Sequence, residues 1–116
     1  MTPHEALIDR TARFGIAKSW MGDLAGTGHG VMLSAGDPGA GEAGYVAVET
    51  VEGTLHDRSG GLAFAQLGLM CDGASTLRYV VVPGSGYGEL AGITGELTLR
   101  VEEGVHRYEL AYSVAG

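Results

Sequence analysis

Glu49 is the residue with the clearest potential for chemistry in this sequence, because its carboxyl interrupts a stripe of apolar side chains. In the predicted strand 44–55 every second residue points to the same side of a sheet. The residues that share this face with Glu49 are Tyr45, Val51 and Leu55. If the face lines an enclosed interior, apolar surroundings favour the neutral carboxyl, as a general acid or base near neutral pH requires. Glu49 is therefore the candidate catalytic residue.

The same carboxyl also fits a purely structural ion pair. Buried carboxylates are often held by a cation without any part in catalysis, and this is the more common situation. The candidate partners are Arg58, Arg78 and Arg100. Both roles for Glu49 stay open at the level of sequence.

Five further side chains are candidates to line a ligand pocket beside Glu49. They are Tyr45, Phe64, Gln66, Tyr108 and Tyr112. Gln66 offers an amide and the tyrosines offer phenol groups on faces that are otherwise apolar, and small-molecule pockets are built in this way. Packing in the core is the alternative role for the tyrosines, and it is the more common one.

Seven runs of alternating or β-branched residues must position these groups, and they predict β-strands. The runs are 10–20, 24–34, 44–55, 62–70, 76–82, 95–102 and 105–114. Short turns join them, so neighbours in sequence are expected to pair antiparallel. Glycine makes up 21 of the 116 residues, and it permits the bends that close a sheet into a barrel. We therefore expect an all-β chain, a single antiparallel β-barrel of seven or eight strands.

Two glycine-rich stretches shape this expected barrel. The stretch 83–95 joins two strands and predicts a corner with one short helical turn near 89–92 that ends at Gly92. Gly26, Gly28 and Gly30 share one face of strand 24–34 and leave a strip without side chains. We expect an aromatic side chain from a neighbouring strand to cover this strip, with a ligand or a second backbone as the alternative.

Strands 10–20 and 62–70 each show a departure from simple alternation. Lys18 breaks the apolar face of strand 10–20, which otherwise carries Phe14, Ile16 and Trp20. Strand 62–70 is largely apolar on both faces, which predicts a barrel core on one side and a partner subunit on the other. A homodimer is the expected assembly.

The overall composition excludes several classes of partner. A net charge of −7 argues against nucleic acid and anionic membranes, which bind positive surfaces. Cys71 is the single cysteine, so no intrachain disulfide or thiolate metal cluster can form. The histidines are His4, His29, His56 and His106, and they lack metal-ligand spacing. No phosphate-binding loop or signal peptide is recognised, so we expect no cofactor, no metal and a cytoplasmic location.

Several motifs together are similar to those of a known bacterial family. They are ETVEGTL at 49–55, RSG at 58–60, VPGSG at 82–86, GELAGITG at 88–95 and YELAY at 108–112. Their order and spacing resemble the family catalogued as domain of unknown function 3224. The resemblance implies a calycin-like barrel similar to allene oxide cyclase, with about eight strands and a central cavity. The chain 1–116 would be one domain, in which residues 1–9 are either disordered or an extra edge strand.

These observations favour binding over catalysis. The first hypothesis is a barrel that holds a small lipophilic molecule, with Glu49, Gln66 and Tyr112 orienting its polar end. The second is a cofactor-free isomerase or cyclase in which Glu49 acts as general acid or base. A dimeric structural barrel without a ligand is the third.

Overall fold

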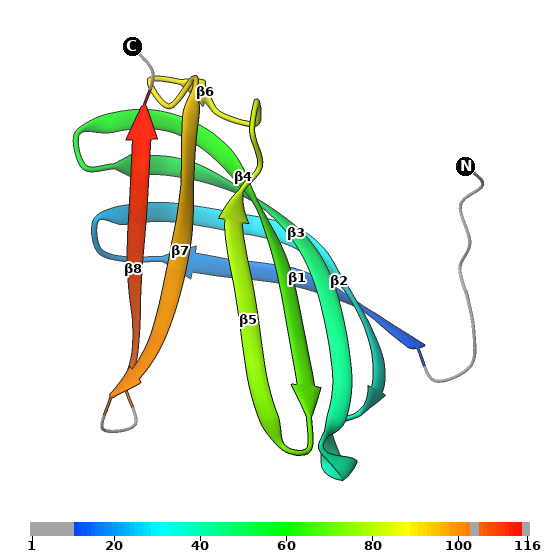
Figure 1. Cartoon of the computed structure of the whole chain (residues 1–116). Helices are drawn as coiled ribbons and strands as arrows, with labels where there is room; N and C mark the ends of the chain where they lie inside the picture. The colour runs from blue at the N-terminus through cyan, green and yellow to red at the C-terminus, as the bar shows by residue number, and fades with distance from the viewer. Residues whose placement is uncertain (1–10, 103–104, 115–116) are drawn as a thin grey trace.

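The computed structural model describes residues 11–102 and 105–114, which form one antiparallel sheet (Figure 1). Side chains are described for residues 11–99 and 108–114. The strands are β1 (Thr11–Trp20), β2 (Leu24–Asp37), β3 (Glu42–Leu55), β4 (Arg58–Cys71), β5 (Ala74–Val81), β6 (Tyr87–Gly88), β7 (Ile93–Glu102) and β8 (Val105–Val114). The seven predicted strands are all present, and β6 is an addition. Residues 1–9, for which we expected disorder or an edge strand, lie outside the described residues.

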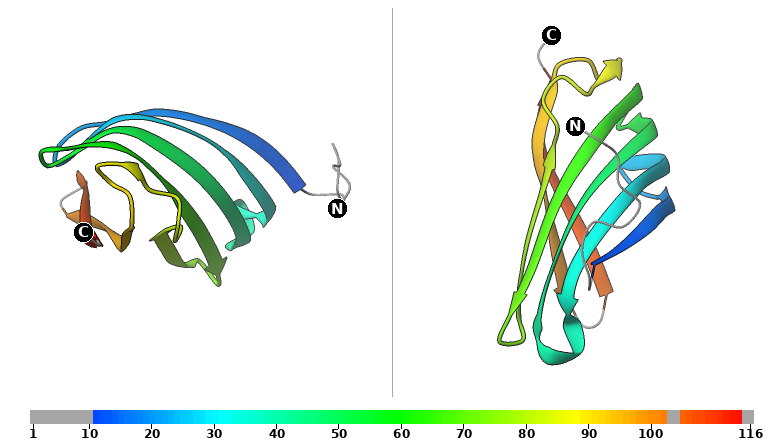
Figure 2. Two further views of the ribbon diagram at one scale, coloured as in Figure 1. Left: turned by 90° about the horizontal axis from the view of Figure 1, so that it is seen from above. Right: turned by 90° about the vertical axis from the view of Figure 1, so that its right-hand side faces the viewer.

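The sheet has two free edges within the described residues. Its order is β1-β2-β3-β4-β5-β7-β8, while β6 pairs with β4. No pairing joins β1 to β8 in this part of the chain, so the closed barrel that we expected is not confirmed. Figure 2 shows instead a strongly curved sheet, in which β7 and β8 turn back beneath the arch of β1–β4. The curvature gives the sheet a concave and a convex face.

The long hairpins extend further than the sequence pattern indicated. β2 continues to Asp37, beyond the predicted run 24–34, and a 3-10 helix (Pro38–Ala40) follows it. The Asp37 carboxylate accepts a hydrogen bond from the backbone of Gly39 at 2.9 Å, and Gly41 ends this helix with a φ of 79°. Alternation alone missed this extension, because the residues flanking the loop are small and lack a clear apolar face.

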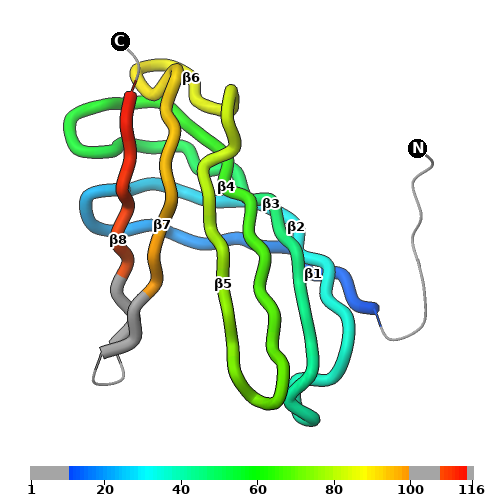
Figure 3. Tube along the Cα trace, in the orientation of Figure 1, coloured from blue at the N-terminus to red at the C-terminus, as the bar shows by residue number. Residues whose placement is uncertain are grey.

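The glycine corner is a series of tight turns (Figure 3). Leu90 and Ala91 donate backbone hydrogen bonds to Tyr87 and Gly88, each three residues earlier, and no helix forms. The prediction of a helical turn near 89–92 is therefore wrong, because these residues form hydrogen-bonded turns instead. Gly92, with a φ of 80°, ends the series as expected, because glycine adopts this conformation without steric cost. Leu90 and Ile93 anchor the corner in the core.

The two faces of the sheet differ in burial. The concave face holds the hydrophobic core, whose most buried members include Leu55, Leu62, Phe64, Leu90 and Ile93. On the convex face several large apolar side chains remain exposed, namely Val31, Leu33, Val46, Val48, Leu67 and Leu69. The homodimer expected through this face stays a prediction. Within the described residues, the structure contains no helix whose length and apolar character would let it cross a membrane.

Candidate functional site

Glu49 lies at the centre of a buried polar cluster on the concave face. Its side chain is fully buried, and three donors from two other strands contact it. Trp20 Nε1 of β1 donates to Oε2 at 2.9 Å, and the Tyr79 hydroxyl of β5 donates to Oε1 at 2.9 Å. The Lys18 ammonium of β1 forms a salt bridge with Oε1 at 3.0 Å. The burial of Glu49 is thus compensated by one charged and two neutral donors.

The glycine strip of β2 makes room for this cluster. A Cβ built on Gly28 would lie 2.2 Å from Glu49 Oε2 and 3.0 Å from Trp20 Nε1, so a side chain at this position would clash with both groups. The carboxylate of β3 and the indole of β1 meet over the bare backbone of the strand between them. The expected cover by a neighbouring aromatic is confirmed for Gly28, although Glu49 shares the space with Trp20.

Tyr79 is held in its neutral form by its surroundings. Burial, followed by the charge of Glu49, raises the pKa of its hydroxyl well above the ordinary value. Lys18 lies 3.2 Å from the same hydroxyl and 4.6 Å from the centroid of the Trp20 ring. The Lys18 side chain is 35% exposed, so it is the member of the cluster that solvent reaches. The cluster therefore combines an ion pair, a cation–π contact and neutral hydrogen bonds.

The ion pair predicted for Glu49 exists, but its partner is different. Among the described side chains, the cation that pairs with Glu49 is Lys18 and not Arg58 or Arg78. Arg78 instead lies 4.0 Å from Glu96. The side chain of Arg100 lies outside the described part of the chain. Lys18 could have been identified from the sequence because it interrupts the apolar face of strand 10–20. A charged residue on such a face needs a partner of opposite charge when it is buried.

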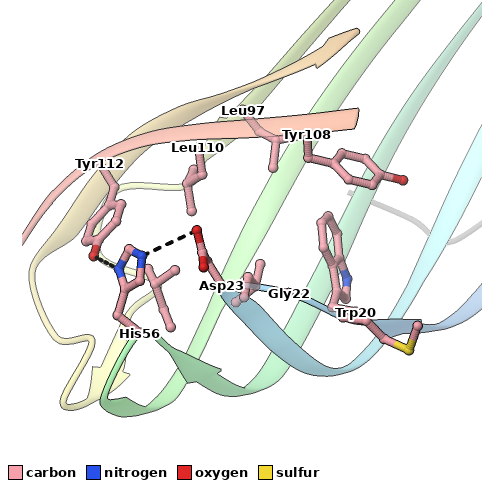
Figure 4. A pocket seen from close by; sticks show the side chains of 11 residues that line it. Trp20, Gly22, Asp23, His56, Leu97, Tyr108, Leu110 and Tyr112 are labelled. Carbon is pink, nitrogen blue, oxygen red and sulfur yellow. Dashed lines mark hydrogen bonds and ion pairs between the residues drawn. The ribbon is translucent and has the colours of Figure 1, made fainter. Parts of the chain in front are cut away.

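A pocket of about 290 Å³ opens where the β1–β2 and β3–β4 turns approach β8 (Figure 4). At its edge the Tyr112 hydroxyl and His56 Nδ1 are 2.5 Å apart, and His56 Nε2 lies 3.5 Å from Asp23 Oδ2. His56 also donates its backbone N–H to the Asp23 carbonyl at 2.9 Å, which holds the two turns together. Sequence reasoning missed Asp23 and His56, because their turns meet only in the folded chain.

A second and larger pocket, of about 540 Å³, occupies the other end of the concave face. Its walls include Phe14, Met32, Met70, Leu77 and Leu99, and they expose little polar surface. Tyr45 also lines it, and burial raises the pKa of this tyrosine above its ordinary value. The Tyr45 hydroxyl donates a hydrogen bond to Gln66 Oε1 at 3.3 Å. The pocket is therefore mainly apolar, and its lining also holds the Tyr45 phenol and the hydroxyls of Ser34, Ser75 and Thr76, with the Gln66 amide beside it.

The residues proposed to surround one pocket are distributed over the concave face. Phe64 is fully buried against Trp20 and Tyr79, with ring centroids 5.6 and 5.0 Å away. Tyr45 and Gln66 belong to the larger pocket or lie beside it, whereas Tyr108 and Tyr112 line the smaller one. Glu49 is not among the described residues that line either of these two pockets.

Histidines and acidic residues do not gather into a ligand set in the part of the chain that the structure describes. No group of three or more His, Cys, Asp or Glu side chains there could hold a metal ion. His4 and the side chain of His106 lie outside that part. Cys71 is an exposed free thiol.

Comparisons with known proteins agree with this architecture. Among solved structures, a protein with unknown function from the DUF3224 family of Shewanella oneidensis MR-1 is similar, with a TM-score of 0.85 and 35% sequence identity. The similarity covers 100% of this chain and 88% of that one. A search of curated proteins gives no match. The family model described as "Protein of unknown function (DUF3224)" matches residues 2–112, so the chain belongs to the DUF3224 family.

Proposed function

We propose that this protein binds a small lipophilic molecule in the larger pocket on its concave face. The observation that carries the proposal is the lining of this pocket, which is mainly apolar around a volume of about 540 Å³. Small-molecule sites usually have volumes of roughly 300 to 1,000 Å³ and walls of this kind. Transfer of an apolar ligand from water to such walls is favourable in proportion to the area that it covers.

Tyr45 and Gln66 are the polar groups that would orient the ligand. Tyr45 lines the pocket, and its hydroxyl engages the Gln66 carbonyl oxygen. The Gln66 amide nitrogen thereby keeps its donors for a carbonyl or hydroxyl oxygen of the ligand. A molecule with an apolar body and one polar end fits this combination. The similarity to the allene oxide cyclase barrel stays a prediction and carries no part of this proposal.

The alternative of a cofactor-free isomerase or cyclase has less support. A general acid or base must reach the substrate, whereas Glu49 is fully buried and its oxygens accept from Lys18, Trp20 and Tyr79. These contacts favour a structural role for the carboxylate. A purely structural dimer has less support as well, because an apolar concavity of this size keeps apolar surface out of a core that serves only stability.

Two matched substitutions test the binding proposal. Leu77 lines the pocket and is 38% exposed, whereas Leu67 is 42% exposed and belongs to the convex face. With the neutral dye Nile red as probe, Leu77→Glu should weaken binding at least about tenfold, because the ligand then meets a charge that it cannot pair. Leu67→Glu should change the affinity less than about twofold.

A larger loss of dye affinity in Leu67→Glu than in Leu77→Glu would place the dye on the convex face and refute the proposal. Native mass spectrometry of the protein purified from its expression host provides a second readout. The expected result is a non-covalent mass adduct that organic solvent extracts, and that is lost in the Leu77→Glu variant. An adduct retained in equal amount by this variant would also count against the pocket.

A further inference from the structure

The smaller pocket, of about 290 Å³, combines aromatic rings with negative charge. Trp20, Tyr108 and Tyr112 line it, and so does the carboxylate-bearing Asp23. Among its described lining residues there is no lysine or arginine. The faces of aromatic rings carry partial negative charge, so rings and carboxylate attract the same kind of ligand. None of these residues lines the larger apolar pocket.

Asp23 lies between two aromatic groups, as Figure 4 shows. On one side it approaches His56, which is hydrogen-bonded to Tyr112. On the other side are the rings of Trp20 and Tyr108, whose centroids are 5.3 Å apart. The Asp23 side chain is 84% exposed, so a solute can approach its carboxylate directly from water.

The contacts of His56 engage one oxygen of the Asp23 carboxylate. In a neutral imidazole, Nε2–H donates toward Asp23 Oδ2, while Nδ1 accepts from the Tyr112 hydroxyl. This arrangement satisfies both ring nitrogens without a positive charge on the histidine. His56 Nε2 approaches one carboxylate oxygen at the long distance of 3.5 Å, so the exposed carboxylate can meet a second partner.

The indole ring of Trp20 already attracts one cation, whose charge is paired with Glu49. The Lys18 ammonium lies 4.6 Å from the centroid of the indole ring, within the range of a cation–π interaction. The net charge of −7 adds a long-range attraction for cations. Leu97 and Leu110 supply apolar surface in the same pocket.

We propose that this pocket binds a small organic cation, an alkylammonium or quaternary ammonium group on a short apolar body. Asp23 supplies the counter-charge, and the rings of Trp20, Tyr108 and Tyr112 supply the aromatic walls. A volume of about 290 Å³ is at the lower end of ligand sites and limits the occupant to a small molecule. This site is independent of the lipophile proposed for the larger pocket.

Choline and 3,3-dimethyl-1-butanol provide the test, because the alcohol has the shape of choline with a neutral carbon in place of the charged nitrogen. Trp20 is the single tryptophan, so its fluorescence reports on the pocket directly. Choline should bind at least about tenfold more tightly than the alcohol, and added KCl should weaken its binding. Equal affinities, or no response by fluorescence and calorimetry up to about 50 mM choline, would overturn the proposal.

A pair of charge-removing variants separates the pocket from the general negative field of the protein. Asp23→Asn should weaken choline binding by about fivefold, the effect of one close charge in water. Asp72→Asn removes the same charge from the turn at the opposite end of β4, where asparagine tolerates the φ of 52°. This control should stay within about twofold of the wild type. An equal loss in both variants would mean that net charge alone attracts choline, and the assigned site would be wrong.

Tyr108→Leu tests the aromatic contribution separately. Tyr108 is 53% exposed, so the fold should tolerate its replacement. Choline binding should weaken by about fivefold, while binding of the neutral alcohol should change less. If both probes lose affinity equally, the ring acts only as apolar surface and the cation assignment fails.

Discussion

The Glu49 cluster and the Asp23–His56–Tyr112 chain are two groups of polar side chains that differ in their access to water. Glu49 is fully buried, and its partners come from β1 and β5. The side chains of Asp23 and His56 are 84% and 52% exposed, and they extend from turns. Burial strengthens every interaction in the first group and makes each lost partner costly, whereas water can replace lost partners in the second.

The two groups are also positioned by different means. Trp20 and Glu49 meet because Gly28 lacks a side chain, so the packing of three strands sets their geometry. His56 is positioned by its backbone, which has a φ of 50° and donates to the Asp23 carbonyl. The buried group links β1, β3 and β5 through direct contacts, while water reaches the side chains of the exposed group. Substitutions should therefore separate stability from binding.

The largest effect is expected for Lys18→Met, which leaves a fully buried carboxylate with two neutral donors. The free energy of unfolding should fall by about 3 kcal/mol, near the lower end for a broken buried pair, because Lys18 is partly exposed. Urea denaturation followed by circular dichroism measures this loss. The double variant Lys18→Met/Glu49→Gln should lose less than the sum of the two single variants, because no uncompensated charge remains. Simple additivity would refute the ion pair.

Gly28→Ala should have the next largest effect, because its Cβ would lie 2.2 Å from Glu49 Oε2. Displacement of a pinned carboxylate should cost about 2 kcal/mol, as for other overpacked interiors. Gly15→Ala on β1 is the matched control, since its Cβ meets nothing within 4 Å. The control should change stability by less than about 1 kcal/mol. Equal melting temperatures for the two variants would contradict the role assigned to the glycine strip.

Tyr79→Phe should cost about 1 kcal/mol at neutral pH, since one hydrogen bond to Glu49 is lost. The substitution should also change how the stability of the fold depends on pH in alkaline solution. The pKa of Tyr79 is raised in the folded state, so above about pH 10 the unfolded chain loses the proton while the folded chain keeps it. The stabilisation contributed by the neutral Tyr79 hydroxyl is fully present below about pH 10, and it decreases as the pH rises toward the pKa of Tyr79 in the folded state.

Melting temperatures between about pH 9 and pH 11 measure this dependence. The wild type should lose stability more steeply than the Tyr79→Phe variant. Tyr87→Phe serves as the control, because Tyr87 is 52% exposed. It should follow the wild type, and a Tyr79→Phe curve parallel to the wild type would contradict the raised pKa.

The smallest effect on stability is expected for His56→Asn in the exposed group. Asparagine tolerates the positive φ of this turn, so the substitution removes the imidazole contacts and keeps the backbone. Thermal unfolding should shift by an amount equivalent to less than about 0.5 kcal/mol, as for other surface changes. A loss as large as that of Lys18→Met would abolish the distinction between the two groups.

Much of the strand pattern could be predicted from local sequence, because side chains alternate every two residues whatever the rest of the chain does. The bounds of β8 and the faces of Glu49 and Trp20 follow from this period. The break in the apolar face at Lys18 was visible too. The length of β2 and the turns around Gly92 were not, since small residues carry little periodic signal.

The alternating pattern placed Glu49 on an apolar strand face, and an ion pair with a cation was one of two roles that it left open. The tertiary structure decided that the cation is Lys18. In the sheet Lys18 pairs with Gly28, and Glu49 pairs with Gly30. The side chains of Lys18 and Glu49 therefore meet diagonally across β2, whose two residues on this face are glycines. Such a contact depends on strand order, register and curvature together, and these are properties of the whole sheet that no local pattern contains.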